Sequence, residues 1–278
     1  MAYLSDMQAD TGLLTARADR NKGLELQAQY QAAQPFPHIV IDDFLPPDVL
    51  ERCLTDFPAR AEDTTVFNRD QERNKAQFNP DEMSPWLRTL FYGFNSRPFI
   101  HVLQNITGIK GLIPDPYFLG AGFHEIGEGG HLSVHADFNH HKPMDLERRI
   151  NILIYLNKDW KEEFGGSLEL WSDGMASREH VIVPSFNRCV IFNTTSESWH
   201  GNPTPVHHPD GRTRKSIALY YYTSTWTKAK RDHTTQFQAR PGSEDKFDWR
   251  VKLKESAVDL MPPALYRALK KGKASEEA

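Results

Sequence analysis

Residues 148–157 read RRINILIYLN, and this stretch decides which kind of fold the chain can form. Isoleucine recurs at every second position, whereas Asn151 and Tyr155 fall on the opposite side of an extended chain. The aliphatic side is suited to packing beneath helices. Polar groups on the other side cost about 1–3 kcal/mol each when they are buried without a partner. The stretch therefore predicts a β-strand with helices on one face and a bound ligand on the other, although an ordinary protein partner for Tyr155 is an equal alternative.

A second strand is predicted at residues 214–222, RKSIALYYY, where the residue types are typical of strands and alternate cleanly. Arg214 and Ser216 share one face with the small Ala218, and Lys215 lies on the other face. This pattern predicts a cavity with a guanidinium at its base, and a guanidinium can bind a carboxylate through two parallel hydrogen bonds. Taken alone, Arg214 has a simpler explanation as the cation of a structural ion pair.

The chain also carries a pattern typical of metal ligands. His135 and Asp137 stand two residues apart in an extended-looking segment, so both side chains can reach one ion. His200 lies in a short segment bounded by Gly201 and Pro203, where a strand end is expected. Two imidazoles and one carboxylate can hold iron(II) on one face and leave the opposite face open for a cosubstrate and dioxygen. A single His-x-Asp pair usually lies on a protein surface and binds no metal. The interpretation as a metal site therefore depends also on the two strands predicted at residues 148–157 and 214–222.

Helices are expected mainly before the metal-ligand pattern. We predict a strand at residues 38–44, a helix that starts near Pro46, and an apolar helical stretch over residues 85–106. Short strands separated by turn residues fill about residues 116–226. The predicted fold is mainly β, a double-stranded β-helix of the jelly-roll or cupin-like kind, with supporting N-terminal α-helices.

Three regions are expected along the chain. Residues 1–114 would form the N-terminal helical and strand support, residues 115–226 the β-helix core, and residues 227–278 a C-terminal extension with a helix at residues 262–269. With 278 residues, of which 39% are hydrophobic, the chain can bury a large core as one domain with such extensions.

Charge and cysteine content bear on the expected partners and cellular location of the protein. The formal net charge of −4 gives no general attraction to phosphate backbones, so nucleic acid is not an expected partner. The two cysteines, Cys53 and Cys189, fall in apolar patterns typical of core packing and do not form a disulfide framework. The N-terminus lacks the apolar stretch of a signal peptide, so we expect no membrane association and a location in the reducing cytoplasm. No sequence feature predicts the oligomeric state.

In combination, these motifs resemble those of a known enzyme family. The matching features, in chain order, are HAD at residues 135–137, YLNKDW at 155–160, GGSLEL at 165–170, PSFNR at 184–188, WHG at 199–201 and RKS at 214–216. Over about residues 115–226 the chain resembles the iron(II)- and 2-oxoglutarate-dependent dioxygenases of the prolyl hydroxylase-like branch. Residues 35–46 also resemble the N-terminal part of bacterial members. One departure is that residues 123–130 lack the tyrosine that family members often place before a glycine turn.

The resemblance implies a role for particular residues of this chain. The implied iron ligands are His135, Asp137 and His200. The implied cosubstrate-binding residues are Arg214, which would bind the distal carboxylate of 2-oxoglutarate, and its assistants Ser216, Tyr155 and Asn151. The implied reaction consumes dioxygen and 2-oxoglutarate and adds a hydroxyl group to an unactivated C–H bond, with ascorbate as a possible reductant.

The sequence leaves the prime substrate open. A prolyl residue of a peptide is slightly preferred, and a free amino acid or a natural product is the alternative. A nonoxidative cupin-type metal protein and a catalytically silent binding module rank lower, because neither explains Arg214-x-Ser216 together with three intact ligands. The expected substrate contacts are His131, Arg148 and Trp199, with a local ion pair to Glu147 or Asp145 as the alternative for Arg148. Residues 138–148 are expected to form a specificity loop in which His140 and His141 are solvated.

Overall fold

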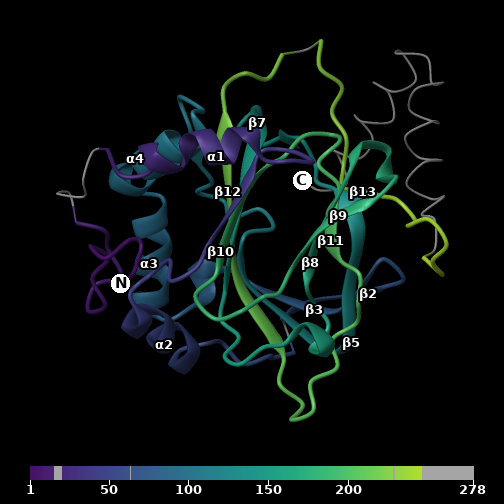
Figure 1. The fold of residues 1–278 in the computed structure, drawn as a ribbon. Coiled ribbons are helices and arrows are strands. Elements are labelled where there is room, and N and C mark those ends of the chain that lie inside the picture. Colours follow the sequence, from purple (N-terminus) through teal and green to yellow (C-terminus); the bar gives the residue numbers. More distant parts are fainter. Residues whose placement is uncertain (16–20, 63, 228, 246–278) are drawn as a thin grey trace, which may run out of the picture.

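The computed structural model describes residues 1–15, 21–62, 64–227 and 229–245. Within them, one curled sheet of 13 strands forms two facing walls, and the helices gather on the outside of one wall (Figure 1). The strands are β1 (His38–Ile41), β2 (Thr65–Arg69), β3 (Glu72–Phe78), β4 (Ile113–Pro114), β5 (Gly122–Ala136), β6 (His140–His141), β7 (Leu146–Tyr155), β8 (Leu168–Trp171), β9 (Arg178–Ile182), β10 (Cys189–Asn193), β11 (His200–Asn202), β12 (Arg214–Thr223) and β13 (Gln236–Phe237). The helices are α1 (Gln27–Ala32), α2 (Pro47–Thr55), α3 (Pro85–Phe94) and α4 (Arg97–Thr107), with short 3-10 turns at Leu24–Leu26, Pro80–Glu82, Glu162–Phe164 and Asp173–Met175.

The main path of the sheet runs β1-β10-β7-β12-β5-β11-β8-β9, and its ladders are antiparallel. The long strand β5 joins the two walls. Its first half pairs with β12, from Gly122 to Ile126, and its second half pairs with β11 through His135. The predicted double-stranded β-helix is therefore confirmed, with the two sheets continuous through β5.

The sequence led us to expect only short strands in this region, and β5 differs from that expectation. Its 15 residues stay in one strand because the segment expected as a glycine turn, residues 127–130, forms a bulge. On the facing strand β3, Arg73 pairs with His131 and Lys75 pairs with Ile126, so a single residue of β3 spans the bulge.

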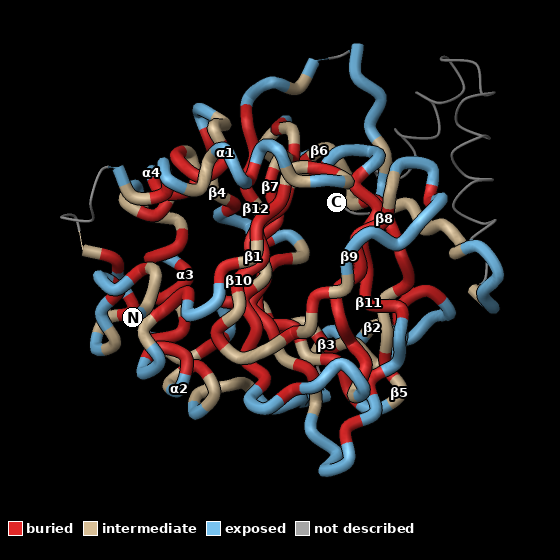
Figure 2. The backbone as a smooth tube through the Cα atoms, viewed as in Figure 1, coloured by how far each residue is buried: buried red, intermediate tan, exposed pale blue. Residues whose placement is uncertain are grey.

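The two faces of β7 have the characters that its alternation predicts. Ile150, Ile152 and Ile154 are fully buried in the main apolar core together with residues of α2, α3 and α4. Leu153 and Tyr155 point to the other side, where they pack in a smaller cluster between the walls. Figure 2 shows the buried backbone concentrated along β7, β10, β12 and β11, with exposed backbone on the outer loops. The helices thus cover the outer face of one wall, and side chains on its inner face point into the space between the walls.

The apolar stretch at residues 85–106 forms two helices instead of the expected single one. The helix α3 begins after Ser84, whose hydroxyl accepts a hydrogen bond from the Leu87 backbone N–H, and it ends at Phe94 with Asn95 as its C-cap. A new helix starts after Ser96 with Pro98 in its first turn, where a missing backbone N–H costs nothing. Gly108 ends α4 in the left-handed conformation.

Two short pieces complete the second wall near the metal-ligand residues. The hairpin of β2 and β3 pairs with the outer edge of β5, and β13 pairs with the end of β5, placing Phe237 opposite His135. No helix among the described residues has the length and apolar character needed to cross a membrane. The helix expected at residues 262–269 lies outside the described residues.

Candidate metal and cosubstrate site

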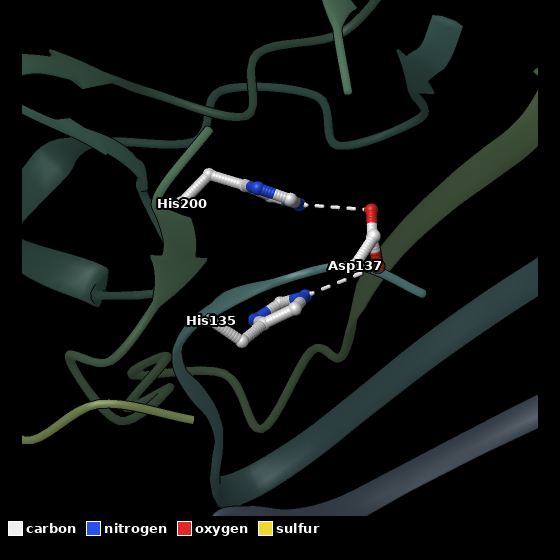
Figure 3. Close-up of side chains that lie close together, drawn as sticks. All are labelled: His135, Asp137 and His200. Carbon is white, nitrogen blue, oxygen red and sulfur yellow. Dashed lines mark ion pairs between the residues drawn. The ribbon is translucent and has the colours of Figure 1, made fainter. Parts of the chain in front are cut away.

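The three predicted metal ligands meet between the walls, and each comes from a different position on the sheet. His135 lies near the end of β5, Asp137 follows that strand directly, and His200 begins β11, where it pairs with His135. One ligand atom from each residue lies within 4.8 Å of the other two. Figure 3 shows both imidazoles directed toward the Asp137 carboxylate. The Nε2 atoms of His135 and His200 lie 3.5 Å and 3.4 Å from its oxygens.

Hydrogen bonds to the backbone orient both imidazoles. Nδ1 of His135 lies 2.8 Å from the Ser133 carbonyl oxygen, and Nδ1 of His200 lies 2.8 Å from the Ser198 carbonyl oxygen. An Nδ1–H donated to a carbonyl leaves Nε2 as the unprotonated lone-pair donor, which is the form that binds a metal. Burial and the nearby His135 also lower the pKa of His200, which keeps its imidazole neutral.

Asp137 stays ionised because charged and polar neighbours surround it. Burial by itself raises the pKa of a carboxylic acid, but the nearby charge of Arg148 outweighs it, and the pKa of Asp137 lies well below its usual range. Arg148 Nη2 lies 3.0 Å from Asp137 Oδ2, and Asn151 Nδ2 donates a hydrogen bond of 2.6 Å to the same oxygen. Two imidazoles with Nε2 directed inward and one ionised carboxylate form the donor set that suits iron(II).

A cavity of about 210 Å³ lies beside the three ligands. Strands from both walls line it, together with Thr235 and Phe237. The polar and aromatic side chains of the lining are Phe67, Arg69, Glu72, Lys75, Gln77, His124, His135, Asp137, Phe138, Arg148, Asn151, His200, Asn202, Arg214, Ser216, Tyr220 and Phe237.

Arg214 is a buried cation that lines the cavity and has no carboxylate partner among the described residues. Its side chain is 4% exposed, and its Nε atom donates a hydrogen bond of 2.7 Å to the Gly166 carbonyl oxygen. The Tyr155 ring lies beneath the guanidinium, 5.0 Å from its carbon. Burial lowers the pKa of Arg214, yet a guanidinium remains charged at neutral pH. The terminal nitrogens of this fork are therefore available to an anion in the cavity.

The double glycine before β8 shapes the place of Arg214. Gly166 has a φ of +69°, and a Cβ atom there would lie 2.8 Å from the Arg214 Cδ atom. Gly165 has a φ of +72°, and a Cβ atom there would lie 1.9 Å from the Pro205 carbonyl oxygen. Glycine is needed at both positions because side chains would displace the loop that holds Arg214.

Among the buried polar atoms of the described residues that lack a hydrogen-bond partner, two lie beside Arg214 or in the cavity wall. They are the Tyr155 hydroxyl, beneath Arg214, and Asn202 Nδ2, in the cavity wall two residues after His200. An unpartnered buried polar group costs about 1–3 kcal/mol. A bound carboxylate beside Arg214 would remove part of this cost, so the residues present fit a dicarboxylate cosubstrate that lies between Arg214 and the metal ligands.

Comparison with known proteins agrees with this geometry. Residues 121–222 match the sequence profile of the 2OG-Fe(II) oxygenase superfamily. These residues form a domain of the 2OG-Fe(II) oxygenase superfamily. The comparison with curated proteins gave no match.

Solved structures share the fold of this oxygenase at low sequence identity. A prolyl hydroxylase from Trichoplax adhaerens, in complex with a peptide fragment of the hypoxia inducible factor oxygen degradation domain, has a TM-score of 0.52 at 17% identity and covers 73% of this chain and 90% of its own. HygX from Streptomyces hygroscopicus, with nickel and 2-oxoglutarate bound, has a TM-score of 0.50 at 10% identity and covers 73% of this chain and 89% of its own. A prolyl-4-hydroxylase from Pseudomonas putida has a TM-score of 0.47 at 18% identity and covers 71% and 98%. At these identities the first two matches confirm the fold alone.

The predictions of the family, the fold and the enzyme class are thus confirmed. Superfamily membership and the triad of His135, Asp137 and His200 imply iron(II) as the metal and 2-oxoglutarate as the cosubstrate of this oxygenase. A nonoxidative cupin and a silent binding module do not agree with this membership. The roles of individual cosubstrate and substrate residues, and the use of ascorbate, stay predictions.

The structure shows protein partners for Arg148 and Asn151 that the sequence did not predict. Arg148 forms an ion pair with Asp137 and not the alternative local pair with Glu147 or Asp145, and because it lines the cavity its contact with substrate stays a prediction. Asn151 faces the cavity, but its amide group is bound to Asp137 and Arg148 and not directed to the Arg214 end. The sequence could not reveal this because the contacts join the two ends of the segment between the metal motif and β7.

The other expected substrate contacts lie away from the cavity. Trp199 packs in a small apolar cluster with Val134 and Trp171, and Nε2 of His131 lies 3.1 Å from the Asp70 carbonyl oxygen. Neither side chain lines the cavity.

The expected loop over residues 138–148 is partly a hairpin of β6 and β7. His141 within it is fully buried, with Nε2 3.3 Å from the buried Asp115 carboxylate. His140 stacks on the Trp226 ring at 4.1 Å between ring centroids. The expectation of solvated histidines was wrong because Trp226 covers His140, while Tyr222 and Asp115 pack against His141.

His124 and the β2–β3 hairpin were missed by the sequence interpretation. His124 pairs with Ser216 across the β5–β12 ladder and lines the cavity near the position of the absent family tyrosine. Burial and the cations Lys75 and Arg214 lower its pKa well below the usual value, so it is neutral. Its place after Phe123 in an alternating strand was the one available signal.

Proposed function

We propose that this oxygenase hydroxylates an unactivated C–H bond, with His135, Asp137 and His200 as iron(II) ligands and Arg214 as the partner of the distal carboxylate of 2-oxoglutarate. One observation carries the proposal: the cavity that holds the three ligand side chains is also lined by a buried guanidinium fork for which the described part of the chain offers no carboxylate partner. Ser216 and the Tyr155 hydroxyl would support the same carboxylate. Bound iron supplies the oxidising chemistry, while these residues hold and orient the cosubstrate.

We propose a prolyl residue of a peptide as the preferred prime substrate. Aromatic rings of Phe67, Phe138, Tyr220 and Phe237 line the cavity, and aromatic surfaces are the usual partners of proline rings in proteins. Phe237 lies 5.4 Å from His135 between ring centroids, so a ring packed on it would lie close to the metal. The prolyl hydroxylase of Trichoplax adhaerens, which has the same fold, is described in complex with a peptide.

A free amino acid is the second candidate, and a different observation favours it. Glu72 lines the cavity and is 5% exposed, with Lys75 Nζ at 2.8 Å and Arg69 Nη2 at 3.0 Å from its carboxylate oxygens. A cluster with one buried anion and two cations can bind both ends of a zwitterion. The cluster lies on the β2–β3 hairpin at the cavity, where Glu72 is buried and the Arg69 side chain is half-exposed.

Product analysis separates the candidates. The enzyme is incubated with iron(II), 2-oxoglutarate and panels of proline-containing peptides and free amino acids, and the products are read by mass spectrometry with succinate measured in parallel. We expect a product heavier by one oxygen atom in the peptide panel. Such a product only in the amino-acid panel would replace the first candidate by the second. Absence of succinate with every panel and in the substrate-free reaction would contradict the proposed activity.

A further inference from the structure

The two oxygens of the Asp137 carboxylate have different surroundings. Oδ2 accepts the 2.6 Å hydrogen bond from Asn151 Nδ2 and lies 3.0 Å from Arg148 Nη2. Oδ1 has neither of these donors and lies 3.5 Å from His135 Nε2, whereas His200 Nε2 lies 3.4 Å from Oδ2. Both donors therefore bind the same oxygen, and the carboxylate lies between them and the two imidazoles.

Arg148 is fixed in place by contacts that do not involve Asp137. Its Nε and Nη2 atoms donate hydrogen bonds of 3.0 Å and 2.6 Å to Asn151 Oδ1, so the guanidinium and the amide hold each other. The rings of Tyr220 and Phe138 lie 3.6 Å and 4.4 Å from its guanidinium carbon. Aromatic faces attract a guanidinium and keep water from it. The pair can thus hold the carboxylate in one orientation.

Burial of the Arg148 guanidinium costs desolvation free energy, and its ion pair with Asp137 offsets that cost. Desolvation of a cation is balanced only when its charge is paired and its hydrogen bonds are well formed. Asp137 is the only carboxylate for which an ion pair with Arg148 is found among the described residues. The ion pair with Arg148 would keep the Asp137 carboxylate both ionised and oriented, and a metal ligand needs both.

We propose that Arg148 and Asn151 are positioning residues that bind Oδ2 of Asp137 and thereby hold its carboxylate in one orientation between the two imidazoles. The proposal rests on the proposed function, since it takes Asp137 as a metal ligand. Hydrogen-bond partners that orient a metal ligand in this way raise the affinity of the site for its metal.

Cobalt(II) binding tests the proposal without turnover. Cobalt(II) is titrated into metal-free wild-type protein and into Asn151→Ser, Arg148→Lys and Arg149→Gln, and visible absorption gives both the dissociation constant and a spectrum sensitive to ligand number and geometry. Arg148→Lys keeps the positive charge and loses the planar fork, so it isolates orientation from charge. Asn151→Ser shortens a side chain that lines the cavity, where water can fill the space. Arg149 is the matched control, since it is half-buried and its Nη1 atom donates a hydrogen bond to Thr223.

We expect Asn151→Ser and Arg148→Lys to bind cobalt(II) about 10–100-fold more weakly, with altered spectra, and Arg149→Gln to match the wild type. Urea unfolding of the metal-free proteins reports whether each variant is folded. Wild-type affinity and spectrum in both variants would overturn the proposal. Weaker binding with an unchanged spectrum, in parallel with a loss of folding, would reduce the pair to a structural role and also overturn it. Failure of the wild type to bind cobalt(II) would contradict the proposed function itself. Unchanged cobalt(II) binding by both variants would contradict only the positioning role of Arg148 and Asn151.

Discussion

Removing the Arg214 side chain should weaken 2-oxoglutarate binding far more than metal binding. Arg214 is buried, its Nε atom is held by Gly166, and its terminal nitrogens have no carboxylate partner among the described residues. Truncating one partner of a buried, hydrogen-bonded charge pair costs about 2–5 kcal/mol. Since every 1.4 kcal/mol is a factor of ten, Arg214→Ala should raise the dissociation constant of 2-oxoglutarate by about 30-fold or more.

Calorimetric titration of 2-oxoglutarate into manganese(II)-loaded protein measures this constant directly and avoids turnover. Lys215→Ala is the control because Lys215, one residue out of phase, points to the other face of β12, where its Nζ lies 3.1 Å from Glu125. Arg214→Lys should retain part of the affinity, because it keeps a charge without the two-pronged geometry. The same constant in Arg214→Ala and the wild type would refute the assignment. A loss confined to Lys215→Ala would mean that the cosubstrate binds on the other face of the strand.

Three further predictions follow from single contacts. Asp137→Ala should lose manganese(II) binding, measured by calorimetry, because only two protein ligands remain. Unchanged binding would mean that the metal binds at a different site. Burial opposes ionisation of Glu72, but Lys75 and Arg69 outweigh it and lower its pKa, so the carboxylate contributes stability that is present above its unfolded pKa of about 4.3 and lost as the pH falls through the lower folded pKa. The difference in urea unfolding free energy between the wild type and Glu72→Gln should therefore shrink from pH 6 toward pH 3, and a constant difference would argue against the ion pair. Gly165→Ala should cost about 2 kcal/mol or more in urea unfolding, because its Cβ would collide with a backbone oxygen. Gly129→Ala, which also has positive φ but open space around a Cβ, should cost less, and equal costs would contradict the steric argument.

The sequence predicted the parts of the fold that depend on local alternation. The patterns at residues 148–157 and 214–222 gave the strands and the correct faces of both, because one face of each packs in an apolar core. The positions of His135, Asp137 and His200 were predicted as one site because two lie on the same side of a strand and the third fits the family pattern. The close approach of their ligand atoms agrees with this.

Contacts between distant segments could not be predicted in the same way. Arg148 was expected to contact substrate or to pair with Glu147 or Asp145, whereas the fold places it beside Asp137 with two aromatic rings around it. Trp199 was expected to contact substrate, whereas its side chain packs in an apolar cluster. The bulge that keeps β5 continuous depends on its pairing with β3, which no local pattern encodes.

The central claim, that this chain is a 2-oxoglutarate-dependent hydroxylase that uses the triad, is tested most directly by isotope transfer. The iron(II)-loaded enzyme is supplied with 2-oxoglutarate, a proline-containing peptide and dioxygen labelled with heavy oxygen, and the succinate and peptide are read by mass spectrometry. We predict one labelled oxygen atom in the succinate and one in the peptide, with neither product formed by His200→Ala. A product that carries oxygen from water alone, or equal turnover by His200→Ala, would contradict the account.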